Sequence, residues 1–157
     1  MPPLPKGFLL IVWLLFFPNA PYVITDLFHL KPKHNIPLWF DLVMLSSFAW
    51  NAMMLGLISL CDVHRMIAAK SNRLIGWTFV MLFILLCGFG VYLGRYERWN
   101  SWNVVSDPAG LFREVGDRFI HPGHHPRTIG VTVVFGMFVL MCYTSLYVLS
   151  GEKKPAD

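Results

Sequence analysis

Four apolar stretches, each long enough to cross a membrane, constrain this chain more than any other feature of its sequence. They cover residues 8–30, 38–60, 74–94 and 128–149, and about 20 apolar residues span a hydrocarbon core of about 30 Å. Lipid offers no partner to a free backbone N–H or C=O group, so such stretches must be helical. With 55% hydrophobic and 14% charged residues, the sequence predicts an all-α, polytopic membrane protein that forms one transmembrane domain over residues 1–157.

Two prolines interrupt the first apolar stretch. From Phe8 to Phe17 a helix rises about 15 Å, which places Pro18 and Pro21 near mid-membrane. A proline inside a helix removes a backbone hydrogen bond and clashes with the preceding turn, and Asn19 could cap a restarted half-helix. The first crossing is therefore predicted to be broken here. Two interpretations stay open: a kink whose carbonyl groups are satisfied by neighbouring helices, or a broken helix that borders a cavity.

The long connection between the third and fourth stretches contains a further helix pattern over residues 108–120. Ser106, Asp107 and Pro108 form a helix start signal. Apolar residues then recur on one side of the predicted helix: Leu111, Phe112, Val115 and Phe119. Charged residues on the other side are spaced for two i,i+4 ion pairs, Arg113 with Asp117 and Glu114 with Arg118. This pattern predicts a short amphipathic helix that lies on the membrane surface.

Chain topology collects polar residues at one membrane surface. The first crossing ends on the side where the second begins and the third ends, so six candidate site residues share that side: Asp26, His29, Asp41, Arg95, Arg98 and Asn100. Ionisable groups at membrane depth are costly and are functional candidates. Paired arginines bind anions with a planar, two-pronged contact. We therefore expect an anionic, lipid-like ligand on Arg95, Arg98, Asp41 and Asn100, with Asp26 and His29 as candidate acid or base groups.

Several alternatives stay open, and the sequence does not determine whether the protein is an enzyme or which cofactor it uses. A mixed oxygen and nitrogen metal site is one alternative, built from Asp26, His29, Asp41 and the loop residue His121. Two nearby arginines would repel a divalent cation and argue against it. A non-catalytic accessory subunit of a larger membrane complex and a small transporter are the others. The three cysteines all lie in apolar stretches without Cys-x-x-Cys spacing, which disfavours a thiolate zinc site.

The sequence resembles a bacterial family of multi-pass membrane proteins that is known only as a domain of unknown function. Two motifs carry this resemblance, PNAPYxxTDLxHL from Pro18 and YLGRxxRWNSW from Tyr92. The resemblance implies the multi-pass fold and no activity. Members commonly have an acidic residue after the second motif where this chain has Asn103, so any cation or proton bound by that acid would lose a ligand here.

Expected partners are membrane lipid and, as an alternative, other membrane subunits or a second copy of the chain. No nucleic-acid-binding module is visible, and membrane location accounts for the net charge of +4. We expect the cell membrane as the location, with the amino terminus inside, because Arg65, Lys70 and Arg73 crowd one short connection. The segment 151–157 is predicted to be a disordered tail.

Overall fold

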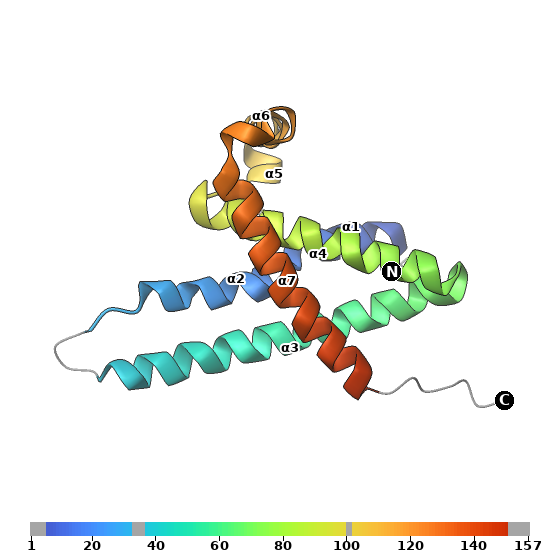
Figure 1. The fold of residues 1–157 in the computed structure, drawn as a ribbon, viewed down its shortest axis with the longest axis horizontal. Helices are drawn as coiled ribbons and strands as arrows, with labels where there is room; N and C mark the ends of the chain where they lie inside the picture. The colour runs from blue at the N-terminus through green and yellow to red at the C-terminus, as the bar shows by residue number, and fades with distance from the viewer. Residues whose placement is uncertain (1–5, 33–36, 100–101, 151–157) are drawn as a thin grey trace, which may run out of the picture.

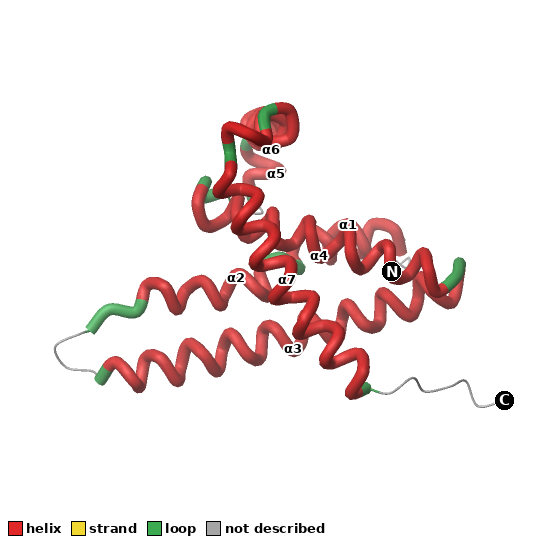
Figure 2. Tube along the Cα trace, viewed as in Figure 1, coloured by secondary structure: helices red, strands yellow, loops and turns green. Residues whose placement is uncertain are grey.

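The structure is a computed structural model that describes residues 6–32, 37–99 and 102–150. All regular elements in these ranges are helices, as Figures 1 and 2 show. In chain order they are α1 (Lys6–Phe16), α2 (Asn19–Tyr22), η1 (Val23–His29), α3 (Leu38–Lys70), α4 (Arg73–Tyr96), α5 (Asn103–Ser106), α6 (Pro108–Ile120), η2 (Pro122–His124) and α7 (Pro126–Leu149). The predicted tail and candidate residue Asn100 lie outside the described residues.

Four helical segments are long and apolar enough to span a membrane, which confirms the predicted all-α, four-crossing architecture. The first runs through α1, α2 and η1, from Gly7 to His29, and the others are α3, α4 and α7. Large apolar side chains on their outer faces are exposed, including Leu55, Leu74 and Val134. Such surfaces are unfavourable in water and suit contact with lipid, so the protein is a multi-pass membrane protein.

Helix α3 extends further than the apolar pattern indicates. The sequence predicts a crossing that ends near residue 60 and a polar connection over residues 62–73, whereas α3 continues to Lys70. This segment contains no Gly or Pro, and its Ala, Met, Arg and Lys residues favour helix. The connection is reduced to Ser71 and Asn72, and the Asn72 side chain caps α4 by accepting a hydrogen bond from the Ile75 N–H at 2.8 Å.

The first crossing changes direction at Pro18 without unwinding. Pro18 keeps helical backbone angles (φ −58°, ψ −18°), and hydrogen bonds continue across the interruption, from Phe17 N–H to Trp13 O at 2.9 Å and from Tyr22 N–H to Pro18 O at 3.1 Å. The backbone is therefore kinked and not unwound, and the kink borders a cavity of about 210 Å³ that Pro18, Asn19 and Tyr22 help to line. The expected cap by Asn19 is wrong, because Pro18 occupies the cap position and Asn19 already lies within the first turn of α2.

Close packing on α4 accommodates this kink. A Cβ added to Gly90 would lie 3.1 Å from the Pro18 side chain, and one added to Gly94 would lie 3.0 Å from the Tyr22 ring. On α1, the indole of Trp13 stacks on the ring of Phe83 with 4.7 Å between centroids. The two glycines thus let the kinked crossing approach the third crossing closely.

Helix α7 crosses α4 and forms the other main interface of the core, as Figure 1 shows. Gly88 lies at this crossing, where an added Cβ would clash with the carbonyl oxygen of Thr132. Val80 on α4 and the residues Val139 and Tyr143 on α7 are fully buried in the hydrophobic core. The α4–α7 contact therefore depends on a glycine at the point of closest approach.

The predicted interfacial helix is present as α6, between Pro108 and Ile120. Its cap is Asp107, whose side chain accepts a hydrogen bond from the Gly110 N–H at 2.9 Å, and Pro108 is its first residue. Figure 1 shows α5 and α6 together at one end of the molecule, beyond the carboxyl end of α4 and the amino end of α7. This end carries most of the polar contacts described next.

Candidate functional site

Arg95, in the last turn of α4, joins the ends of the first and third crossings. Its Nη2 donates a hydrogen bond to His29 Nδ1 at 2.7 Å, and its Nη1 lies 3.9 Å from Asp26 Oδ1. The guanidinium also lies over the Phe28 ring, 5.9 Å from the centroid. We call Asp26, Phe28, His29 and Arg95 the Arg95 cluster. It shows that these ends share one membrane side, as the topological argument predicts, and that Arg95 already has acceptors within the chain.

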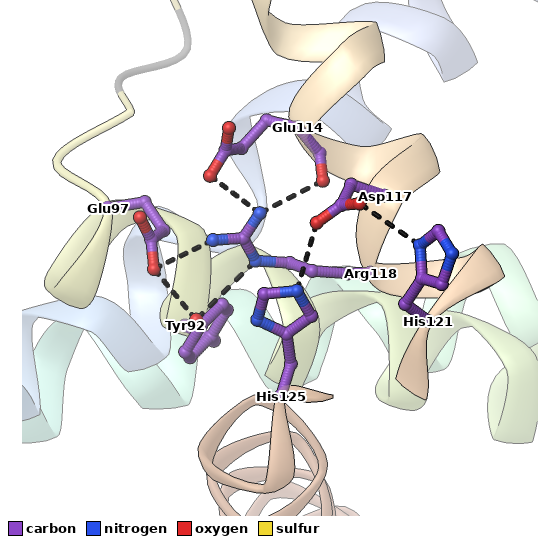
Figure 3. A network of polar contacts seen from close by, with 7 residues as sticks. All are labelled: Tyr92, Glu97, Glu114, Asp117, Arg118, His121 and His125. Atoms are coloured by element: carbon purple, nitrogen blue, oxygen red, sulfur yellow. Dashed lines mark hydrogen bonds and ion pairs between the residues drawn. The ribbon is translucent and has the colours of Figure 1, made fainter. Parts of the chain in front are cut away.

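A second cluster holds α6 against the end of α4, and Figure 3 shows its members. Arg118 of α6 is buried, with 8% of the residue exposed. Its Nη2 lies 2.9 Å from Glu97 Oε1, and its Nη1 lies 2.6 Å from Glu114 Oε1. Tyr92 donates to Glu97 Oε1 at 2.7 Å and accepts from Arg118 Nε at 3.4 Å. We call Tyr92, Glu97, Glu114 and Arg118 the Arg118 cluster, in which two carboxylates contact the one positive charge.

Asp117 lies on the exposed side of α6 and contacts two loop histidines. Its Oδ1 is 3.2 Å from His121 Nδ1, and its Oδ2 is 2.9 Å from His125 Nε2 (Figure 3). Of the two ion pairs predicted along α6, Glu114 with Arg118 is therefore confirmed. The pairing of Arg113 with Asp117 is wrong, because the chain turns back after Ile120 and brings histidines to Asp117 instead.

These contacts shift the pKa values of the carboxyl groups in one direction. The hydrogen bond from Tyr92 lowers the pKa of Glu97 most, against the effect of burial, and Arg118 lowers it further. Hydrogen bonds from His125 and then His121 lower the pKa of Asp117. Burial disfavours the charge on Arg118, but its bonds to Tyr92, Glu114 and Glu97 outweigh burial and raise its pKa. Glu97, Asp117 and Arg118 are therefore held in their ionised forms at neutral pH.

An apolar groove of about 520 Å³ lies between α4, α6 and α7, and Arg118 lines the end of it that adjoins the Arg118 cluster. The lining residues are Leu82, Leu85, Leu86 and Phe89 of α4, Arg118 and Phe119 of α6, and Thr128, Ile129, Thr132 and Val133 of α7. Its volume falls within the roughly 300–1,000 Å³ of small-molecule sites. Among the described residues, two buried side-chain atoms have no hydrogen-bond partner, the hydroxyl groups of Thr128 and Thr132, and both residues line this groove.

The other predicted ligand residues lie apart from the groove. Helix α4 ends at Tyr96, so Arg98 is outside the helix, exposed, and has a left-handed backbone with φ 58°. The sequence pattern suggested that Arg98 shares a helical face with Arg95, and this is wrong because α4 ends between them. Asp41 lies half-buried in the first turn of α3.

The alternative metal site is not assembled in this structure. Within residues 6–32, 37–99 and 102–150, no three His, Cys, Asp or Glu side chains lie close enough together to hold a metal ion. His121 contacts Asp117 and stacks on His124 with 5.7 Å between ring centroids. His29 contacts Arg95. The four residues Asp26, His29, Asp41 and His121 are thus not gathered in one place.

Sequence reasoning missed a buried polar contact at the opposite end of the bundle. His64 of α3 is 2% exposed, and its Nδ1 lies 2.5 Å from the hydroxyl oxygen of Tyr143 on α7. The ring of Tyr147 stacks on the imidazole at 5.5 Å. A signal was present, because His64 continues at helical spacing the buried stripe that includes Leu57 and Cys61. This contact ties α3 to α7, where the sequence predicted only a polar connection.

The fold and these contacts define an integral membrane protein with four membrane-spanning helices and a surface helix held by charged side chains. Residues 4–142 match the family described as protein of unknown function, DUF1361, and the chain belongs to this family. Neither the curated proteins nor the solved structures give a significant match to the chain. The match confirms the expected domain of unknown function, and it leaves the activity to be argued from the site.

Proposed function

We propose that the protein binds a membrane lipid or lipid-like amphiphile, with an apolar chain in the α4–α6–α7 groove and a polar head beside α6. The observation that carries this proposal is the groove itself. Its walls are Leu, Ile, Val and Phe side chains, and its upper end meets the buried Arg118. An apolar site with a few polar groups at one end is complementary to an amphiphile.

The depth of the groove supports a chain that enters from one leaflet. From Tyr96 back to Leu82, α4 rises about 20 Å, while one leaflet of the hydrocarbon core is about 15 Å thick. Leu82, Leu86 and Ile129 on the walls are more than half exposed. The groove is therefore open along its side, and a lipid can enter from the bilayer.

The charges at this end bear on the nature of the head group. Arg95 and Arg118 already hold carboxylate or imidazole acceptors, so neither is well placed to bind a new anion. Three other arginines at this end are exposed, Arg98, Arg113 and Arg127. Arg127 lies over the Tyr96 ring at 5.8 Å and directly precedes the groove residue Thr128. We propose that an anionic head group, where the lipid has one, contacts Arg127 rather than Arg95.

Lipid retention in a groove-filled variant tests this function. In Leu85→Trp the larger side chain occupies the groove, whereas Leu55→Trp places the same side chain on the outer face of α3 as a matched control. Native mass spectrometry of the detergent-purified chain is expected to show one retained lipid in the wild type and in Leu55→Trp, and none in Leu85→Trp. Equal retention by all three proteins would refute lipid binding in the groove.

The same proposal includes an orientation. Arg65, Lys70 and Arg73 surround the tight α3–α4 connection, and short connections rich in Lys and Arg stay on the cytoplasmic side. We propose that this connection faces the cytoplasm of a cell membrane, together with the amino terminus. The Arg95 cluster, the Arg118 cluster and the open end of the groove then face the opposite side.

A second candidate function, an accessory subunit of a larger membrane complex, is favoured by one observation on α3. Asn51 lies on an exposed face of this crossing, and its Nδ2 donates to the Ser47 carbonyl oxygen at 2.8 Å. The amide has further hydrogen-bonding capacity, and such groups associate with other helices in membranes. Asn51→Leu is then expected to lower the mass of the complex on native gels after mild solubilisation, whereas Leu55→Ala leaves it unchanged.

A further inference from the structure

The two unpartnered hydroxyl groups in the groove indicate the chemical class of the bound lipid, an inference that rests on the proposed function. Thr128 and Thr132 lie four residues apart, on one face of α7. Thr128 is only 7% exposed. Both hydroxyl oxygens are buried, and neither has a hydrogen-bond partner in the described part of the chain.

Other hydroxyl groups in the crossings satisfy themselves on their own helix. Ser47 donates to the Val43 carbonyl oxygen at 2.8 Å, Thr78 to that of Leu74 at 3.0 Å, and Thr144 to that of Leu140 at 2.9 Å. This local bond is the usual solution for a hydroxyl group in a membrane helix. Thr128 and Thr132 do not use it: both residues line the groove, and their hydroxyl oxygens are closed to solvent in the empty groove.

The position of the two groups matches the layout of an acyl lipid. Thr128 lies in the first turn of α7, near the membrane surface, and Thr132 lies about 6 Å deeper along the helix. Gly88 fixes the depth of Thr132, because the absence of a side chain there lets α4 pack against the Thr132 carbonyl group. The two threonines therefore lie at successive depths along α7, and both lie deeper in the membrane than the exposed Arg127.

The acceptor is expected to be uncharged. Arg118 is the charged residue on the groove wall, and Glu97 and Glu114 balance it. A second anion placed at the two threonines would be repelled by these carboxylates, whereas the exposed Arg127 lies outside this position. A neutral carbonyl oxygen accepts a hydrogen bond from a threonine hydroxyl at little cost of desolvation.

We propose that the groove binds an ester- or amide-linked acyl lipid, whose carbonyl oxygens accept hydrogen bonds from Thr128 and Thr132 after rotation about their Cα–Cβ bonds turns the hydroxyl groups into the groove. The polar head group lies outside them, near Arg127, and the acyl chain lies against the apolar wall that includes Leu85 and Phe89. The two threonines thus select lipids with carbonyl groups over lipids that have the same chains and lack them.

A pair of lipids that differ only in the carbonyl groups tests this selection. The purified full-length chain is equilibrated with diacyl or dialkyl phosphatidylglycerol of the same chain length, and retained lipid is counted by native mass spectrometry. The wild type is expected to retain the diacyl lipid about five- to tenfold better, the ratio that one net hydrogen bond produces. In Thr128→Val/Thr132→Val the preference is expected to disappear, while the dialkyl lipid is retained as in the wild type.

Two controls separate this inference from the proposed function. Thr78→Val and Thr144→Val remove hydroxyl groups that bond within their own helices, and they are expected to keep the preference. Equal retention of both lipids by the wild type, with both lost in Leu85→Trp, would overturn carbonyl recognition and leave lipid binding intact. Retention that Leu85→Trp does not change would instead overturn the groove as the site.

Discussion

At the scale of single residues, Arg118 is the side chain on which the position of α6 depends. Arg118→Met removes a buried cation and leaves Glu97 and Glu114 facing each other without it. Loss of one partner from a fully buried pair costs about 3–5 kcal/mol. Both glutamates are partly exposed here, so we expect a loss on the order of 2 kcal/mol, measured as a lower unfolding midpoint in detergent. Arg113→Met, an exposed change on the same helix, is the control and should have little effect.

A matched second change tests whether the pairing itself is responsible. Glu97→Gln in the Arg118→Met background removes one of the two stranded carboxylates, so it should restore part of the lost stability. The same Glu97→Gln change in the wild type should be destabilising, because it removes the negative charge that pairs with Arg118 and strengthens the hydrogen bond from Tyr92. If the two losses simply add, the side chains are not coupled.

The lowered pKa of Glu97 predicts a dependence of stability on acid. A carboxyl group whose pKa is lower in the folded protein stabilises the fold above its unfolded pKa and loses that contribution as the pH falls through the folded value. For Glu97 the ordinary pKa is 4.5 and the folded value is lower. The ionisation of Glu97 should change the unfolding midpoint little between pH 7 and 5, and its protonation should lower the midpoint below about pH 4.5. Glu97→Gln should show a shallower fall, and parallel curves would contradict the assignment.

At the scale of elements, the packing of α4 against α7 is predicted to weaken when a side chain is added at their point of closest approach. Gly88→Ala places a methyl group against the Thr132 carbonyl oxygen, which is backbone and cannot turn away. The helices must separate, and overpacking of this kind costs about 1–3 kcal/mol. Gly130→Ala on α7 meets no atom within 4 Å and is the control. Thermal unfolding in detergent should show a lower midpoint for the first variant and an equal or higher one for the second.

The same scale shows what the sequence could and could not predict. The crossings, the kink at Pro18 and the cap of α6 at Asp107 depend on hydrophobic length and on local backbone chemistry, so the pattern of the chain was enough. The burial of Arg118 is not local. It depends on Tyr92 and Glu97 at the end of a different helix, and an isolated α6 pattern places this arginine on the polar face.

Non-local packing also explains the corrections at the candidate site. Arg95 and Arg98 would share a face only if α4 continued past Tyr96, and the left-handed backbone at Arg98 ends that relation. The sequence places His64 in a polar connection because the apolar pattern ends near residue 60, whereas α3 continues to Lys70. Its partner Tyr143 lies on α7, and nothing in the spacing of either residue along the chain links the two.

At the scale of the whole molecule, the two ends of the bundle have different chemistry. One end has the Arg95 and Arg118 clusters, in which carboxylates balance the guanidinium groups and α6 covers the end of α4. The other has a tight α3–α4 connection with Arg65, Lys70 and Arg73, above the buried His64. Three of the Lys and Arg residues therefore crowd one short connection, and this crowding is the physical basis of the proposed orientation.

Single-cysteine labelling tests that orientation directly. In a background with Cys61, Cys87 and Cys142 replaced, Ala69→Cys places a thiol at the α3–α4 end and Val105→Cys places one beside α6, both at exposed positions. In intact cells a membrane-impermeant maleimide should label only the second, and after the membrane is opened it should label both. Leu55→Cys, on a lipid-facing surface, should stay unlabelled in either case because a thiolate does not form in hydrocarbon. Labelling of Ala69→Cys alone in intact cells would invert the orientation and leave the fold unchanged, whereas labelling of both would contradict the placement of the two ends on opposite sides of the membrane.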